Sequence, residues 1–321
     1  MAAGIILSFV LHDGAVCDNM GAMKQWLCAM LAGVGLMIPA YAEVWALRLP
    51  ETALVPSYAK ATYVSRMHER HGGSHMGMQD YTVNLPFVDA RRSHVGSWWY
   101  NIQANVTATI MDVGGTLNLR RDELFEFGVP VTIVRPLHDG KDKFMFTIMP
   151  RYSGDDVSSA HAWDLAMVAD YSIKHSETLT YSIGLAASPR FAERVAVPYV
   201  SFYWQSSPDW LVRLRGYQLS ALYRVTERLS VGPALGCLGG TWMVSTPKGQ
   251  RILRVRSLMA AVTAEYNFAP VGKPKRVFVA ALGSTLATSA ELCNRTSRKD
   301  TIQAYHYKPG VVASLEVDFR F

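Results

Sequence analysis

The sequence ends in the stretch V-V-A-S-L-E-V-D-F-R-F, which runs from Val311 to Phe321 and decides the fold class. Counting back from the end, every second residue is apolar, and the residues between them include Arg320, Asp318, Glu316 and Ser314. Alternation with a period of two residues places one apolar face and one charged face on a single β-strand. The stretch therefore predicts a strand whose two faces meet different environments.

A second alternating stretch, from Trp98 to Ile110, is unusually long. One face would carry Trp98, Tyr100, Ile102, Ala104, Val106, Ala108 and Ile110, and the other Asn101, Gln103, Asn105, Thr107 and Thr109. Strands in globular proteins average about five or six residues. A tilted strand that crosses a bilayer needs about 9–11 residues, with its polar side facing a lumen. The stretch therefore favours a closed transmembrane β-barrel.

The composition excludes two other classes of protein. Half of the 321 residues are apolar, yet no stretch after residue 42 is long enough for a membrane-spanning helix, which excludes a helical membrane protein. The net charge of +6 is spread along the chain and forms no basic block, so nucleic-acid binding is not indicated. Cys237 and Cys293 are the cysteines after residue 42, and they could pair in an oxidising compartment or stay free.

The N-terminal region predicts export. Lys24 precedes an apolar segment, Trp26 to Ile38, and Ala40-Tyr41-Ala42 is an A-x-A cleavage pattern, so we expect a signal peptide over residues 23–42. An uncleaved anchor helix is the alternative. Residues 1–22 would then be an over-extended start, residues 43–57 a periplasmic lead-in, and residues 58–321 the barrel.

Turn signals between alternating runs suggest twelve to thirteen strands in residues 58–321. Because single-chain bacterial barrels have even strand numbers, we predict about 12, within a range of 10–14. Two segments, Tyr171–Gly184 and Tyr223–Gly232, share a hairpin pattern of Tyr-x-Ile/Val, polar turn and Leu-Ser/Thr. With Trp210 to Val225 taken as one strand, these two turns would lie at opposite ends of the barrel, which indicates that one strand is miscounted.

The ending L-E-V-D-F-R-F resembles the C-terminal signal that the assembly machinery of bacterial outer-membrane β-barrels recognises, and its apolar residues are Leu315, Val317, Phe319 and Phe321. Val195 to Val244, with its aromatic strand and S-P-D-W turn, is similar to a family of uncharacterised outer-membrane barrels. The resemblance implies an all-β, closed, antiparallel, up-and-down transmembrane barrel in a Gram-negative outer membrane. It further implies outer-membrane lipids and the barrel-assembly machinery as partners, and it supplies no substrate and no functional residues.

Two kinds of chemistry, metal binding and hydrolysis, are not predicted. His68, His71 and His75 form the one histidine cluster, which could approach a transition metal, but the segment is Gly-rich and lacks both cysteine and the H-E-x-x-H spacing. We interpret it as a solvated loop, with no metal and no cofactor. No G-x-S-x-G motif is present to place a nucleophile, so no catalytic residue and no enzyme activity are predicted.

Four arginines are the candidate functional residues. Arg213 and Arg215 would share one strand face, and Arg254 and Arg256 another. Such residues either line a lumen, where charged rings set selectivity, or pair with acids inside it, or lie at the rim near lipid head groups. The sequence therefore predicts a porin-like barrel of unknown cargo, acting as a passive channel or a structural envelope protein. The alternatives are a soluble or surface-attached β-sandwich binding protein and a membrane-embedded hydrolase.

Overall fold

The computed structural model describes residues 57–88, 94–95, 97–138, 141–188, 196–215, 218–269, 276–294 and 300–319. The expected signal peptide, its cleavage residues Ala40 and Ala42, nearly all of the expected lead-in, and Phe321 lie outside these residues. No helix in the described part is long and apolar enough to cross a membrane. Apart from one short 3-10 turn, η2 (Ala160–Ala162), the regular elements of that part are β-strands.

The strands of the described residues are β1 (Ser57–His68), β2 (His75–Val88), β3 (His94–Val95), β4 (Trp98–Gly114), β5 (Glu123–Gly128), β6 (Val131–Leu137), β7 (Asp142–Gly154), β8 (Trp163–Lys174), β9 (Leu179–Ala187), β10 (Val197–Gln205), β11 (Trp210–Arg215), β12 (Gln218–Arg224), β13 (Leu229–Thr246), β14 (Gly249–Asn267), β15 (Arg276–Cys293), β16 (Thr301–Tyr307) and β17 (Val311–Phe319).

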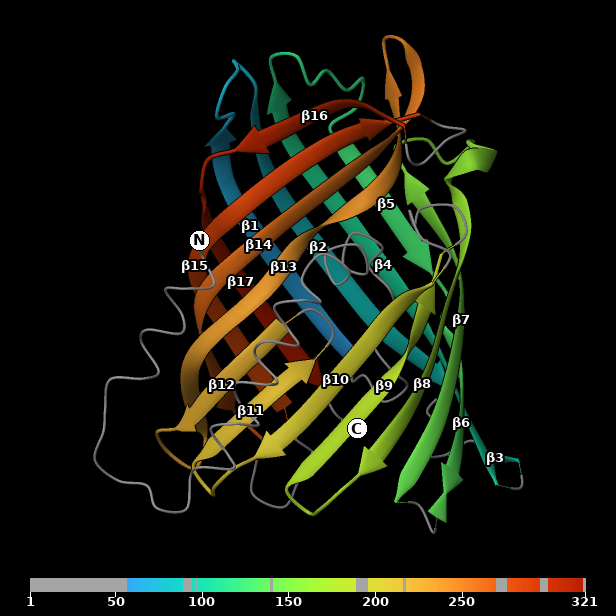
Figure 1. The fold of residues 1–321 in the computed structure, drawn as a ribbon, viewed down its shortest axis with the longest axis vertical. Coiled ribbons are helices and arrows are strands. Elements are labelled where there is room, and N and C mark those ends of the chain that lie inside the picture. Colours follow the sequence, from blue (N-terminus) through green and yellow to red (C-terminus); the bar gives the residue numbers. More distant parts are fainter. Residues whose placement is uncertain are drawn as a thin grey trace. The chain divides into compact units, whose positions relative to one another are not determined.

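The sheet closes on itself (Figure 1). Neighbours in sequence pair antiparallel around the ring, and the last strand returns to the first: β17 pairs with β1, for example at Ala313 and Tyr63. Closure gives each position of the ring a partner on both sides, which removes the free edges that an open sheet would expose. The prediction of an all-β, closed, antiparallel barrel is confirmed, and the β-sandwich alternative is wrong.

The ring of described strands has 14 positions, the upper limit of the predicted range. β5 and β6 lie end to end between β4 and β7, β16 and β17 lie end to end along β15, and β3 pairs only with the start of β4. The number 12 was too low because Trp210 to Val225 was taken as one strand. It forms the two strands β11 and β12, which pair from Trp210 and Tyr223 up to Arg215 and Gln218.

The extra strand places both recurring hairpins at one end of the barrel. This terminal end holds the start of β1 and the end of β17, together with the four-residue connections 138–141, 175–178, 206–209 and 225–228. In three of them a hydroxyl accepts a hydrogen bond from the first backbone N–H of the next strand: Ser176 from Leu179 (3.0 Å), Ser207 from Trp210 (3.2 Å) and Thr226 from Leu229 (3.0 Å). Such turns are short because the side chain replaces a missing backbone partner.

The opposite end, which we call the loop end, is built from fewer strands. β13 pairs with β12 only as far as Gly236, and beyond Gly239, whose φ is +132°, it reaches β7, where Met243 forms a parallel bridge with Gly154. β8 to β12 are bypassed there. The loop-end ring therefore runs through β13, β14, β15, β16, β1, β2, β4, β5 and β7, and we call this nine-strand section the cap. In Figure 1 the long β13, β14 and β15 contrast with the short β11 and β12.

The outward face of the 14-strand section is apolar. The large apolar side chains that it exposes include Tyr63, Tyr81, Val83, Leu85, Phe87, Val106, Ile110, Phe125, Phe127, Ile133, Phe144, Ile148, Leu165, Ile183, Leu185, Val262, Leu282, Leu315 and Phe319. The two faces expected of Trp98 to Ile110 are confirmed, because Val106 and Ile110 are exposed while Thr107 and Thr109 are buried. On β17 the alternating apolar residues also face outward, and Leu315 is 53% exposed.

This apolar belt has chemically distinct borders. Near the terminal end it carries aromatic residues at strand ends, among them Trp98, Trp210, Tyr223 and Tyr266, and Trp210 packs on Tyr223 with ring centroids 5.2 Å apart. Toward the cap it ends on charged pairs, such as Arg66 with Asp112 at 2.7 Å. On β14 the belt extends from Tyr266 to Leu258, close to the length of about 9–11 residues that a bilayer-crossing strand needs.

Candidate functional site: the barrel interior

The interior face of the 14-strand section carries many polar side chains beside buried apolar ones such as Val134 and Met145. Its hydroxyl groups bond to one another across neighbouring strands. Four such pairs are Thr82 with Thr107 (3.0 Å), Thr132 with Thr147 (2.8 Å), Ser182 with Ser201 (2.6 Å) and Ser257 with Thr288 (2.7 Å). Each pair gives two buried hydroxyls a partner, so the wall is polar without being charged at these points. Asp80 adds an acceptor on the same face and receives a hydrogen bond from Thr109 at 2.6 Å.

Opposite charges meet on this interior wall. Lys60 on β1 lies 3.4 Å from Glu316 on β17, where the first and last strands pair to close the ring. Arg213 on β11 forms an ion pair with Glu265 on β14 and donates to Ser220 at 3.3 Å. The charges that alternation directs inward are therefore balanced by partners on other strands at both places.

The four arginines of the sequence analysis do not form one ring. Arg213 lies on the interior wall, and the side chain of Arg215 lies outside the described residues. Arg254 and Arg256 occupy the other face of β14, the face that carries Val262, and both approach Glu291 on β15, at 3.3 and 3.9 Å. Arg254 is buried, at 1% exposure, and its guanidinium also lies 3.9 Å from the Cys293 sulfur. A role for any of them in selectivity stays a prediction.

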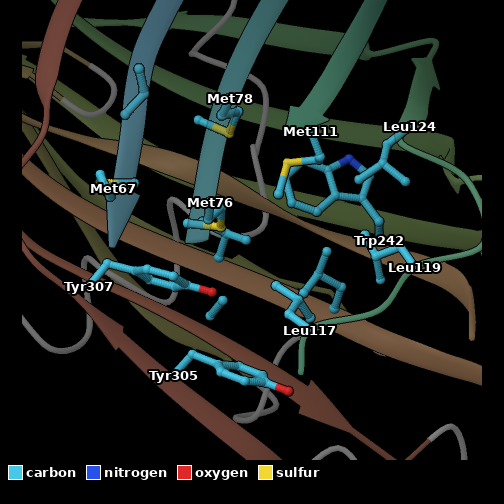
Figure 2. Packing of buried hydrophobic residues seen from close by; sticks show 14 of the residues in the cluster. Met67, Met76, Met78, Met111, Leu117, Leu119, Leu124, Trp242, Tyr305 and Tyr307 are labelled. Atoms are coloured by element: carbon cyan, nitrogen blue, oxygen red, sulfur yellow. The ribbon is translucent and has the colours of Figure 1, made fainter. Parts of the chain in front are cut away.

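The cap interior, in contrast, is filled by apolar side chains (Figure 2). The cluster consists of Val64, Met67, Met76, Met78, Met111, Leu117, Leu119, Leu124, Trp242, Val244, Leu253, Val255, Met259, Ala290, Leu292, Tyr305, Tyr307 and Val312. Figure 2 shows Trp242 beside Met111 and Leu124, so that β13 packs on β4 and β5 inside the ring. All members are buried, and Trp242 has no exposed surface.

Packing of this kind closes the loop end. Barrels of about eight strands have interiors that side chains can fill, whereas larger barrels leave a channel or cavity. The nine-strand cap is near the first size, and its side chains come from both arcs of the ring, β1 to β5 and β13 to β17. Figure 2 places Met67 and Met76 close to Tyr307 on one side of the cluster, with Leu117 between them and Trp242. Passage along the axis therefore requires the cap to change.

The cap was not predicted from the sequence. The segment of His68, His71 and His75 was interpreted as a solvated loop, whereas β1 extends to His68 and β2 begins at His75, which brings Met76 and Met78 into the cluster. Methionines packed into an irregular interior are a common gap-filling solution because the side chain is unbranched and flexible. The signal that could have revealed the cap is the spacing of Met67, Met76 and Met78 around one short turn.

The histidines of that turn make polar contacts of an ordinary kind. The rings of His68 and His75 lie 6.5 Å apart, and His75 Nε2 lies 3.6 Å from Asp112. Within the part of the chain that the structure describes, no group of three or more His, Cys, Asp or Glu side chains could hold a metal ion. Cys237 and Cys293 are both free thiols.

The loop between β7 and β8 contains two neighbouring aspartates with different surroundings. Asp155 is buried and bonds to β13, whereas Asp156 accepts hydrogen bonds only locally, from the Ser158 hydroxyl (2.8 Å) and backbone N–H (3.1 Å). These two bonds hold the pKa of the Asp156 carboxyl below its ordinary value, because they favour the charged form.

Comparison with known proteins gives distant likenesses. No family model matches the chain, and no curated protein matches it. Among solved structures it is similar to an outer-membrane channel from Pseudomonas putida F1 (13% identity, 83% of this chain and 96% of that one, TM-score 0.43). It is also similar to a FadL homologue from Pseudomonas aeruginosa (10%, 82% and 89%, TM-score 0.32) and to the toluene transporter TbuX of Ralstonia pickettii (8%, 83% and 90%, TM-score 0.28). All three TM-scores are below 0.5, so the barrel assignment rests on the strand pairing of this chain.

Proposed function

We propose that this chain is a bacterial outer-membrane β-barrel that acts as a passive channel of unknown cargo, closed at its loop end in the resting state, or else serves as a structural envelope protein. The observation that carries the proposal is the apolar belt on the outside of a closed ring whose inside is polar. In a water-soluble barrel this arrangement would be reversed, with polar groups outside. An outward apolar face about as long as a bilayer-crossing strand, such as Tyr266 to Leu258 on β14, fits contact with lipid.

The borders of the belt support a membrane position. Trp98, Trp210, Tyr223 and Tyr266 gather near one edge, where amphipathic aromatic rings suit the boundary between hydrocarbon and head groups. The other edge ends on charged pairs such as Arg66 with Asp112. The terminal end has short connections, as expected for the periplasmic side of such barrels, which would place the cap outside the cell.

The wall chemistry fits a channel, because paired hydroxyls such as Thr132 with Thr147 line the interior and water-filled barrels have polar interiors. Plugged barrels have polar interiors as well, so a conductance measurement decides between the channel and the structural role. The closed cap would make such a channel silent at rest. The proposal includes no enzymatic activity.

Fractionation and gel migration test the membrane position. The full chain, expressed in a Gram-negative host, should be recovered with the outer membrane and should migrate differently before and after boiling, as folded barrels do. Recovery in the soluble periplasmic fraction would refute the proposal. Single-channel recording in planar bilayers then separates a channel from a structural barrel, because a structural barrel stays silent even when the cap is disrupted.

The route of export is part of the proposal. We propose cleavage after Ala42, which intact mass measurement of the outer-membrane form would detect as a mature chain that begins at Glu43. We also propose that Phe321, with Leu315, Val317 and Phe319, is read by the barrel-assembly machinery. Phe321→Ala should lower the amount of folded barrel, whereas Arg320→Ala, the matched neighbour, should not. Equal yields for the two variants would contradict this role.

A further inference from the structure

The cap is held together unevenly around its ring. β13 and β14 pair along the whole hairpin, from Leu229 with Tyr266 to Thr246 with Gly249, and β2 pairs with β4 from His75 to Val88. Between β7 and β13 the ladder is a single bridge, Met243 with Gly154. The end of β1 meets β16 at another single bridge, Glu69 with Tyr307, but that junction continues directly into the long β1–β17 ladder. The bridge between β7 and β13 adjoins no such ladder, so this seam is the place where the cap separates with the least disruption of strand pairing.

Side chains reinforce the seam at two residues, of which Ser153 on β7 donates to the Thr241 carbonyl of β13 (2.7 Å) and Asp155 makes the larger set of contacts. The Asp155 carboxylate accepts hydrogen bonds from the Ser245 backbone N–H (2.5 Å) and from its hydroxyl (3.2 Å), while the Asp155 N–H donates to the Met243 carbonyl (3.1 Å). The Asp155 carbonyl accepts from Arg121 (2.7 Å), which ties in the loop before β5. Asp155 therefore joins three segments of the cap, and its charged hydrogen bonds are stronger than neutral ones.

The backbone of β13 supplies a place to bend. After Gly236, its last residue paired with β12, follow Gly239 with φ at +132° and Gly240. Positive φ at this angle is readily adopted only by glycine, so the strand changes direction there without strain. Beyond this point β13 keeps β14 as its partner, and the two can move as a hairpin.

We propose that the seam between β7 and β13 is the gate of the closed end and that Asp155 is its latch. This inference rests on the proposed channel function and names the part of the cap that opens. Breaking the latch leaves the lower ring intact, because β8 to β12 continue to link β7 with β13 in the 14-strand section. A parted seam would join the polar lumen to the outside past Trp242 and the methionine-rich cluster.

The test uses single-channel recording on full-length barrels that show the heat-dependent gel shift of a folded barrel. Asp155→Ala removes two hydrogen bonds to a charged group and should raise the open fraction on the order of tenfold to a hundredfold. Asp156→Ala is the matched control: it removes a neighbouring carboxylate that bonds only to Ser158, and it should leave the open fraction unchanged.

A reversible version covers the case in which Asp155→Ala fails to fold. In a background with Cys237→Ala and Cys293→Ala, the pair Asp155→Cys with Ser245→Cys replaces the latch by a disulfide. The oxidised barrel should be closed and the reduced barrel open. The gate would be refuted if folded Asp155→Ala and Asp156→Ala barrels had the same open fraction, or if conductance of the double-cysteine barrel did not change on oxidation. Either result would leave the proposed channel function unaffected. Silence of every variant, Trp242→Ala included, would instead overturn the channel function and the gate with it.

Discussion

The Trp242→Ala variant tests whether the cap is a packed core. The indole is fully buried among residues of β4, β5 and β13, and Figure 2 shows it against Met111 and Leu124. Removing a buried Trp side chain costs about 3–5 kcal/mol, as lost transfer free energy plus the cavity left behind. We therefore expect Trp242→Ala to lower the free energy of unfolding by an amount in this range.

The same change should affect conductance. If the cluster comes apart when the cap opens, the closed state loses this packing and the open state does not. A difference of about 3–5 kcal/mol then corresponds to a rise in the open-to-closed ratio of roughly a hundredfold to several thousandfold. Urea titration of the barrel in lipid vesicles, followed by the gel shift between folded and unfolded bands, measures the stability, and single-channel recording measures the opening.

Trp210→Ala is the matched control for residue type. Trp210 is on the outward face, 43% exposed, and packs on Tyr223 at the border of the belt. Its loss should cost about 0.5–1.5 kcal/mol for the aromatic pair, plus the lost lipid contact, and should leave conductance unchanged. Equal stability and equal conductance for Trp242→Ala, Trp210→Ala and the unaltered chain would refute a packed, closing cap.

Three further predictions address the belt, the seam and the turns. Val262→Arg, at an outward position that is 58% exposed, should destabilise the barrel in bilayers by about 2–4 kcal/mol if it lies near the midplane, and an unchanged urea midpoint would contradict a lipid-facing belt. Gly154→Ala should weaken the seam, because an added Cβ would lie 2.8 Å from the Met243 carbonyl oxygen, and it should raise conductance with little change in the yield of folded barrel. In the turn 175–178 the Lys174 ammonium donates to both Glu177 carboxylate oxygens (2.7 and 2.8 Å) and holds the pKa of Glu177 below its ordinary value. Any stability from this pair is present above the pKa that Glu177 has in the unfolded chain, and it is lost as pH falls through the pKa of the folded state. Because Lys174 holds this pKa down, NMR titration should show a higher Glu177 pKa in Lys174→Met.

The fold class was predictable because a closed barrel imposes one rule on every strand. Each strand must turn one face to lipid and the other to the lumen, which produces an alternation of apolar and polar residues with a period of two. The alternation predicted for Trp98 to Ile110 is present in the structure as alternating exposure along β4. The strand number was less accessible. Between β11 and β12 the connection at residues 216–217 is too short to carry a turn signature of several polar residues, and the two strands ran together in the sequence.

The hairpin repeat indicated that the strand count was in error, although it did not show which strand was miscounted. Tyr171–Gly184 and Tyr223–Gly232 share a hydroxyl at the same place in the turn, and the structure shows why: Ser176 and Thr226 accept from the first N–H of the next strand. Identical turn chemistry predicts the same end of the barrel. A conflict between that expectation and the strand count was therefore evidence against the count.

The closed end could not be predicted, because the rule for lipid-facing strands fails where both faces of a strand are covered by protein. Thr241, Trp242, Met243 and Val244 are four consecutive buried residues on β13, and their sequence shows no alternation. Strands buried on both faces give continuous apolar runs, and such a run is equally compatible with a soluble core. What distinguishes the two cases is the partner of β13 at this height, Gly154, which lies about ninety positions away in sequence. This long-range pairing could not be read from the local sequence pattern, and it forms the seam at which Asp155→Ala and Gly154→Ala should raise conductance.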